Sequence, residues 1–120
     1  MDKGINNKIT QYVYSVANKT NGFVTAYLFG SYAKNKQTQD SDIDIAFIID
    51  NLKDSDKFDM QVQFLLLASQ FDNRIEPHIL SKSDMLSDNP FVFDIKKTGI
   101  EIKIKTAYDQ DKITKYIWNF

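Results

Sequence analysis

The sequence contains no cysteine, so it can form neither a disulfide framework nor a thiolate metal site. It has no apolar run near the ~20 residues that a membrane span needs. Its start, MDKGINNKITQ, is too polar for a secretory signal. Its net charge is only −1 and its lysines and arginines are scattered, so it lacks the basic stripe that follows a nucleic-acid backbone. We therefore expect a soluble, cytoplasmic protein that binds neither a membrane nor a long nucleic acid.

The densest basic group is four lysines near the end of the chain, Lys96, Lys97, Lys103 and Lys105. Such a group is more typical of a solvated face than of a groove that tracks phosphates. A tRNA end or a short oligonucleotide remains compatible with it.

The length of 120 residues suits one domain, and we assign residues 1–120 to a single domain. A domain of this size buries roughly 65% of the surface of its unfolded chain. With 42% hydrophobic residues, the chain can build a core without stabilising disulfide bonds or structural metal ions. No repeat, low-complexity stretch or internal linker divides it.

Helical and strand patterns alternate along the chain. Apolar spacing predicts helices over residues 5–16 and 56–71, and short helices are expected over 31–36 and 111–120. Asp88 as N-cap, Pro90 in the first turn and Gly99 after the last turn predict a helix over 88–99. Runs of β-branched and aromatic residues predict strands over 23–29, 43–49, 74–80 and 100–104. Pro77 cannot donate to a ladder, so the strand over 74–80 should lie at an edge or be bulged there. The class is α/β or α+β, with one mixed sheet of about four strands flanked by helices.

Asp42 and Asp44 stand one residue apart at the entrance of the strand IDIAFII. Strand side chains alternate faces, so both aspartates point the same way and should lie half-buried and close together. In a solvent-exposed strand end they would only keep an edge soluble. The flanking Phe47, Ile48 and Ile49 instead indicate a strand buried on both faces, where a divalent cation relieves the conflict of like charges. The pair therefore favours a metal–nucleotide site.

Gly30 and Ser31 follow directly after the strand over 23–29. Glycine lets the backbone approach a ligand, and the N-terminus of a following helix attracts phosphate. Alone, this serine would be an ordinary helix cap, but the acidic pair eleven residues later favours a phosphate site. A P-loop is absent, because Asn35 stands where its second glycine belongs.

Glu76 is the candidate third carboxylate, since a charge between Ile75 and Pro77 is unusual within a strand. The alternative is an edge-strand charge that resists aggregation. Arg74 and His78 share the face of Glu76 by the same alternation. A lone histidine is more often structural or on the surface than part of a site, so we leave the role of His78 open.

The stretch GSYAKN followed by SDIDI resembles the G-S-x-A-x-G…S-D-x-D signature of the DNA polymerase β-like nucleotidyltransferases, and in particular of their small MNT-type members. The signature spans residues 30–44. An acid in a later strand and the segment PFVFDIKKTGIEI also resemble those proteins. The resemblance covers about residues 20–104 and implies a nucleotidyltransferase fold.

Three positions deserve comparison with the family pattern. Asn35 replaces the usual glycine, and asparagine tolerates left-handed backbone better than most residues. Lys34 is similar to the usual basic residue of that turn. The third acid is Glu76 in place of the commoner aspartate.

By this resemblance, the protein transfers a nucleoside monophosphate from ATP or another NTP to an acceptor hydroxyl. The resemblance implies two Mg²⁺ ions bridged by Asp42 and Asp44, with Glu76 holding the catalytic ion and helping to deprotonate the acceptor. It implies that Gly30 and Ser31 grip the β- and γ-phosphates. Ser41 would orient the loop, by capping it or by bonding an aspartate.

The chain has room only for the catalytic core, so the acceptor should come from homodimerisation or from a second protein. MNT-type proteins are commonly paired with helical HEPN-domain partners, so the resemblance suggests an antitoxin that adds AMP to its partner. The aromatic tail Tyr116, Ile117, Trp118 and Phe120 could be a docking surface or could fold back on the core. The rival hypothesis is a non-catalytic subunit that neutralises a partner by contact.

Overall fold

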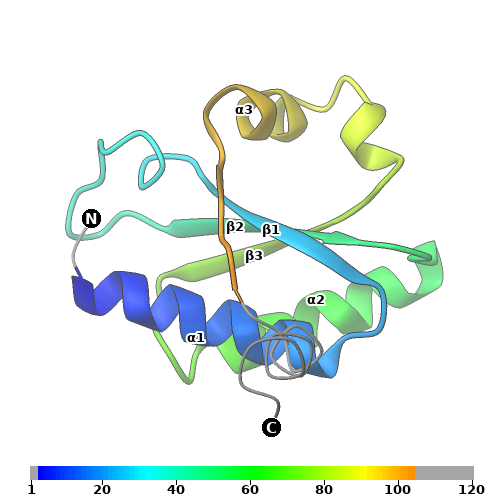
Figure 1. The fold of residues 1–120 in the computed structure, drawn as a ribbon, viewed down its shortest axis with the longest axis horizontal. Coiled ribbons are helices and arrows are strands. Elements are labelled where there is room, and N and C mark those ends of the chain that lie inside the picture. The colour runs from blue at the N-terminus through cyan, green and yellow to red at the C-terminus, as the bar shows by residue number, and fades with distance from the viewer. Residues whose placement is uncertain (1–2, 105–120) are drawn as a thin grey trace, which may run out of the picture.

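A computed structural model describes residues 3–104, which form a four-stranded sheet with helices on both faces (Figure 1). In chain order the elements are α1 (Lys3–Lys19), β1 (Phe23–Phe29), β2 (Ile43–Ile49), α2 (Asp54–Ala68), β3 (Ile75–Ser81), the 3₁₀ helix η1 (Asp84–Leu86), α3 (Pro90–Thr98) and β4 (Ile100–Glu101). No helix in this range is long and apolar enough to cross a membrane. The expected mixed sheet flanked by helices is confirmed, and the class is α+β.

The strands lie in the order β3-β2-β1-β4, with β1 antiparallel to β2 and β4, and β2 parallel to β3. The edge position expected for the strand with Pro77 is therefore confirmed. The carbonyl of Pro77 accepts a hydrogen bond from Gln61 Nε2 at 2.6 Å, so this residue turns its backbone away from β2. Its missing N–H therefore removes no bond from the ladder.

Several element boundaries differ from the predicted ones. The strands β1 and β2 match, whereas β3 is displaced by one residue and β4 spans two residues in place of five. Helix α2 begins earlier than expected, at Asp54, because Asp54 and Asp56 complement the positive end of the helix. The helix predicted over 111–120 and the aromatic tail lie outside the described residues.

Strand β2 separates two layers of the core. Its odd-numbered residues Ile43, Ile45, Phe47 and Ile49 pack in the cluster that includes α1 and α2. Ala46 and Ile48 pack on the other face with Val92 and Ile95 of α3. The strand is thus buried on both faces from Ile45 onward, as the sequence predicts. Asp44 shares the face of Ala46 and Ile48, next to where α3 covers the sheet.

Helix α2 turns an unexpected face to the sheet. Its buried residues are Phe64 and Ala68, and the hydroxyl of buried Tyr12 donates to the carbonyl of Phe64 at 2.8 Å. Burial raises the pKa of the Tyr12 hydroxyl. Four apolar residues of the predicted helical pattern are instead exposed: Phe58 (76%), Val62 (40%), Leu65 (49%) and Leu66 (64%). We call these four residues the outer face of α2.

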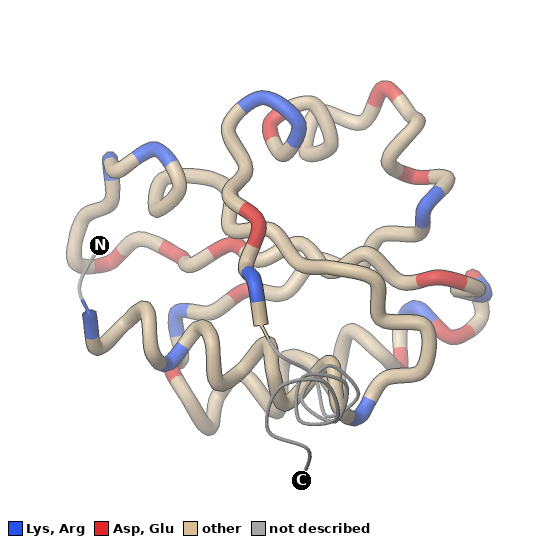
Figure 2. Tube along the Cα trace, in the orientation of Figure 1, with Lys and Arg blue, Asp and Glu red and all other residues tan. Residues whose placement is uncertain are grey.

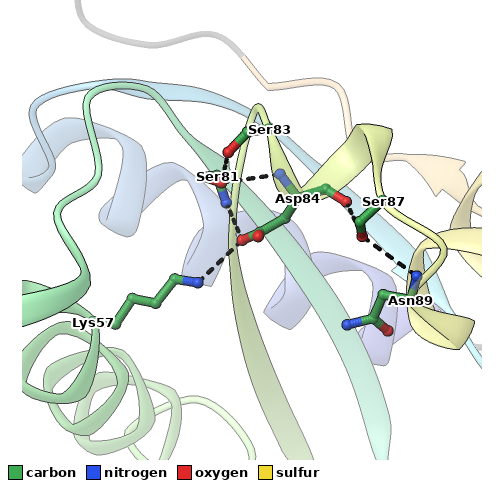
Figure 3. Close-up of polar contacts among 6 residues, drawn as sticks. All are labelled: Lys57, Ser81, Ser83, Asp84, Ser87 and Asn89. Atoms are coloured by element: carbon green, nitrogen blue, oxygen red, sulfur yellow. Dashed lines mark hydrogen bonds and ion pairs between the residues drawn. The ribbon is translucent and has the colours of Figure 1, made fainter.

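A polar cluster joins β3 to α3 and fixes where α3 lies (Figure 3). The Asp84 carboxylate accepts from the Ser81 N–H at 2.9 Å and pairs with Lys57 Nζ of α2 at 3.1 Å. These hydrogen bonds, that of the Ser81 backbone first, lower the pKa of the Asp84 carboxyl. Ser87 donates to the Asp84 carbonyl and accepts from the Asn89 N–H, and Asn89 caps α3 through the Phe91 N–H. The cap is one residue later than the expected Asp88.

Candidate functional site

Three predicted site acids meet at one end of the sheet. Asp44 of β2 lies opposite Phe29 of β1 and, on its other side, opposite Glu76 of β3. Asp42 directly precedes β2, where the Ile43 N–H donates to the Arg74 carbonyl at 2.8 Å. Figure 2 shows acidic positions gathered along the start of β2 and the loop before it. The register brings Glu76 to the side of the aspartates.

The three carboxyl groups differ in exposure and crowd one another. Asp44 is half-buried, whereas Asp42 and Glu76 are exposed. The expectation that both aspartates are half-buried is wrong for Asp42, because it precedes the strand. The pKa of Glu76 is raised, first by partial loss of solvent and then by the hydrogen bond and negative charge of Asp42. Asp44 adds to this increase and His78 opposes it.

Within residues 3–104, no three acidic or histidine side chains stand where they could jointly hold a metal ion. Asp44 Oδ1 is engaged with His78, and Asp42 lies close enough to Glu76 to raise the pKa of its carboxyl. The donor chemistry of the acids nevertheless fits Mg²⁺, which takes carboxylate oxygens. Burial is the first cause of the raised pKa of Glu76, and the negative charges of Asp42 and Asp44 add to it; a divalent cation would relieve that conflict of like charges.

Gly30 directly follows β1 and lies against Asp44. Its φ is +76°, a left-handed value, and a Cβ at this position would lie 2.6 Å from Asp44 Oδ2. Glycine is therefore needed here for its backbone conformation and for space. The turn expected from the sequence to bind phosphate thus lies against Asp44 of the acidic pair.

Residues 30–35 form a turn, so the short helix predicted over 31–36 is wrong. The Lys34 N–H donates to the Gly30 carbonyl at 3.2 Å and the Lys36 N–H to the Ser31 carbonyl at 2.9 Å. Asn35 has a φ of +57°, which interrupts a right-handed helix. The expectation that asparagine takes a left-handed conformation in this turn is confirmed. Anion binding at this point would depend on the turn, since a regular helix N-terminus is not formed.

Lys34 and Ser41 make contacts within the protein. Lys34 Nζ pairs with Asp94 Oδ1 of α3 at 3.0 Å. Burial alone would raise the pKa of the Asp94 carboxyl, but hydrogen bonds from Lys34, Thr98 and the Gly30 backbone lower it below its usual range. Ser41 Oγ accepts from the Thr38 N–H at 2.8 Å, which is the loop-capping alternative considered for this residue. The turn is thereby connected to α3, and the loop before β2 is stabilised by a hydrogen bond within itself.

The two other polar residues near Glu76 separate in the structure. His78 Nε2 lies 3.0 Å from Asp44 Oδ1, so this histidine contacts the acidic pair. Arg74 turns away and pairs with Asp72 at 2.7 Å and with the Tyr32 hydroxyl at 2.9 Å. The period-two alternation places His78 on the correct face, but only the register of β3 against β2 identifies the contact.

Comparison with known proteins gives a family and several structures. The family described as "Polymerase beta, Nucleotidyltransferase" matches residues 8–108. A search of curated protein sequences gives no significant match. A nucleotidyltransferase structure from Sulfolobus solfataricus, itself described only as putative, is 20% identical with a TM-score of 0.57, over 84% of this chain and 86% of that one.

Two further similar structures are of toxin–antitoxin proteins. One, described as a toxin-antitoxin with AMP-PNP, is 23% identical with a TM-score of 0.55, and the match covers 94% of this chain and 84% of that one. The other is a variant of the MntA-HpeT toxin-antitoxin, 25% identical with a TM-score of 0.50, over 93% of this chain and 82% of that one. At these identities the likeness is one of fold.

Proposed function

The chain belongs to the polymerase beta nucleotidyltransferase family. On that premise we propose that it is a Mg²⁺-dependent enzyme that transfers a nucleoside monophosphate, with AMP as the first candidate. The acceptor hydroxyl oxygen would attack the α-phosphorus of the NTP. The bond to the β-phosphate oxygen would break, and pyrophosphate would leave. One observation carries this proposal: the Gly30 turn lies against Asp44 at the end of the sheet where Asp42 and Glu76 also stand.

Each site residue has a proposed role. Gly30 and Ser31 would hold the β- and γ-phosphates in line for attack, since phosphoryl chemistry depends mainly on positioning and charge. Asp42, Asp44 and Glu76 would hold Mg²⁺, which when bound would neutralise the charge of the triphosphate. Glu76 would also help to accept the proton of the acceptor hydroxyl.

The turn and loop complete the proposed site. Lys34 would exchange Asp94 for a phosphate oxygen when the nucleotide binds, because both partners are anions. Ser41 would keep the loop before Asp42 ordered through its bond to Thr38. We also propose that residues 1–120 act as one domain, and that they work in the cytoplasm, where ATP is available.

We propose that the acceptor is a hydroxyl of a partner protein, with a helical HEPN-type toxin as the first candidate. Two similar structures are described as toxin–antitoxin proteins, and one of them carries a nucleotide analogue, AMP-PNP. The protein would then be the antitoxin that modifies its toxin. A second copy of this chain is the alternative acceptor. In that case the label would be found on this protein and not on a partner.

The proposal is tested by incubating the protein with α-labelled ATP, Mg²⁺ and the product of the neighbouring gene. Label should move to the partner with the wild-type chain and fall by at least about 100-fold with Asp42→Asn or Asp44→Asn, since each substitution removes a metal-binding carboxylate. Asp40→Asn is the matched control, because Asp40 lies exposed in the same loop. Turnover retained by the Asp42 or Asp44 variant would refute these roles.

A second candidate function is neutralisation of a partner by binding alone. It is favoured by the engaged side chains of Lys34 and Asp44 and by the lack of a metal-holding group of three within the described part of the chain. A tight complex with no transfer of label, unchanged by Asp42→Asn, would support this function over the enzyme.

A further inference from the structure

His78 is held in a fixed orientation by two aromatic rings. Its ring centroid lies 5.1 Å from that of Phe29 on β1 and 5.3 Å from that of Phe91 on α3. Its side chain is 20% exposed. Three elements, β1, β3 and α3, therefore set the direction in which this imidazole points.

The imidazole points at Asp44. His78 Nε2 lies 3.0 Å from Asp44 Oδ1, and both side chains are half-buried. A carboxylate oxygen can only accept, so Nε2 carries the hydrogen of this bond. Hydrogen bonds to an ionised carboxylate are among the stronger ones in proteins.

The second oxygen of Asp44 is fixed from the other side. Oδ2 lies only 2.6 Å from the position that a Cβ of residue 30 would take, so it packs against the Gly30 turn. One oxygen thus faces His78 and the other faces the phosphate-binding turn. Asp42 and Glu76 carry like charges nearby, which would otherwise push the Asp44 carboxylate away from this position.

We propose that His78 is a positioning residue for Asp44: its N–H holds Oδ1, so that Oδ2 is presented to the Gly30 turn where the nucleotide and its metal would bind. This inference rests on the proposed function. His78 itself does not touch the substrate and acts only through Asp44. Hydrogen-bond partners of metal-binding side chains typically change metal affinity or activity by about 10–100-fold when removed.

The test compares His78→Leu with His78→Gln in the full chain. The Mg²⁺ concentration for half-maximal transfer should rise about 10–100-fold in His78→Leu. His78→Gln should recover part of the loss, because the glutamine amide can place an N–H near the position of Nε2. The same Mg²⁺ titration is repeated with a non-hydrolysable ATP analogue, following thermal stabilisation, so that metal-dependent nucleotide binding is measured without turnover.

Two aromatic residues of α3 provide a matched pair. Phe91→Ala removes a ring that packs on His78 and should shift the Mg²⁺ dependence in the same direction by a smaller factor. Phe93→Ala removes an exposed ring, 67% accessible, that lies beside Lys97, and should leave the dependence unchanged. A loss of stability alone would affect both variants without moving the Mg²⁺ midpoint.

The outcomes separate this inference from the proposed function. An active wild type with the same Mg²⁺ midpoint in His78→Leu would overturn the role of His78 and leave the function standing. A lower midpoint in that variant would also overturn it, since His78 would then be competing with the metal. A wild type with neither transfer nor Mg²⁺-dependent binding of the analogue would remove the proposed function, and this inference with it.

Discussion

At the scale of single residues, the conformation of Gly30 determines where the Asp44 carboxylate can lie. The left-handed φ of Gly30 turns the chain away from β1, and its missing side chain leaves room for the Asp44 carboxylate. The position of a proposed metal-binding oxygen is therefore set by backbone that precedes it by fourteen residues in the sequence. A substitution at Gly30 should therefore change both the rate of nucleotide transfer and the stability of the fold.

Gly30→Ala should lower both the free energy of unfolding and the rate of transfer. A left-handed backbone costs a residue with a Cβ about 1–2 kcal/mol, and the Cβ would also displace Asp44 Oδ2. Urea denaturation measures the first effect and the labelling assay the second. Asn35→Gly is the control: it changes a residue with a similar left-handed φ of +57°, adds no Cβ and should alter stability by less than about 1 kcal/mol. Wild-type rate and stability in Gly30→Ala would contradict this account.

Helix α2 illustrates how an element can differ from its sequence pattern. The residues at helical spacing include Phe58, Val62, Leu65 and Leu66, yet these form the outer face. The buried side is defined by Phe64 and Ala68, because Tyr12 of α1 and Phe47 of β2 contact Phe64. Apolar periodicity predicts the helix correctly but does not decide between two apolar faces, since the choice depends on neighbours distant in the chain.

Phe64→Ala and Leu66→Ala should therefore differ in cost, although both lie on α2. Loss of the buried Phe64 ring should lower the free energy of unfolding by about 3–5 kcal/mol. Loss of the exposed Leu66 side chain should change it by no more than about 0.5 kcal/mol. Chemical denaturation of the two variants at neutral pH provides the comparison. A comparable loss at Leu66 would mean that the outer face is covered in the folded chain.

The sequence predicts the site residues that depend on local pattern better than those that depend on register. The strands β1 and β2 and the left-handed Asn35 follow from residue types within a few positions. The contact of His78 with Asp44 requires the parallel pairing of β3 with β2, which no short stretch encodes. The ion pair between Lys34 and Asp94 likewise requires α3 to lie over the turn.

At the scale of the whole molecule, Asp72 joins three distant parts of the chain. It lies before β3 and pairs with Arg74, which donates to the Tyr32 hydroxyl in the turn after β1. Lys8 of α1 lies 3.7 Å from the same carboxylate. The hydrogen bond from Arg74, opposed in part by burial, lowers the pKa of Asp72 from 3.8 to about 2. This network should contribute to the resistance of the fold to acid.

Asp72→Asn should change the dependence of stability on pH. A carboxyl whose pKa is lower in the folded than in the unfolded state stabilises the fold above the unfolded value, and this stabilisation is lost as the pH falls through the folded value. The difference in unfolding free energy between wild type and Asp72→Asn should thus be largest above pH 4 and shrink between about pH 4 and pH 2. Urea titrations at several pH values measure it. Lys8→Gln, which removes the longer contact to Asp72, should change the dependence of unfolding free energy on pH much less. A pH-independent difference between wild type and Asp72→Asn would contradict the lowered pKa of Asp72.

The outward edge of β3 has a further consequence for behaviour at high concentration. A foreign strand that tried to extend the sheet there would meet Pro77, which offers no donor, and a carbonyl already occupied by the amide of Gln61. Exposed sheet edges are common starting points for aggregation, and proline is one of the residues that block them. This border of the sheet is therefore closed to added strands at Pro77, which should help to keep separate copies of the chain apart.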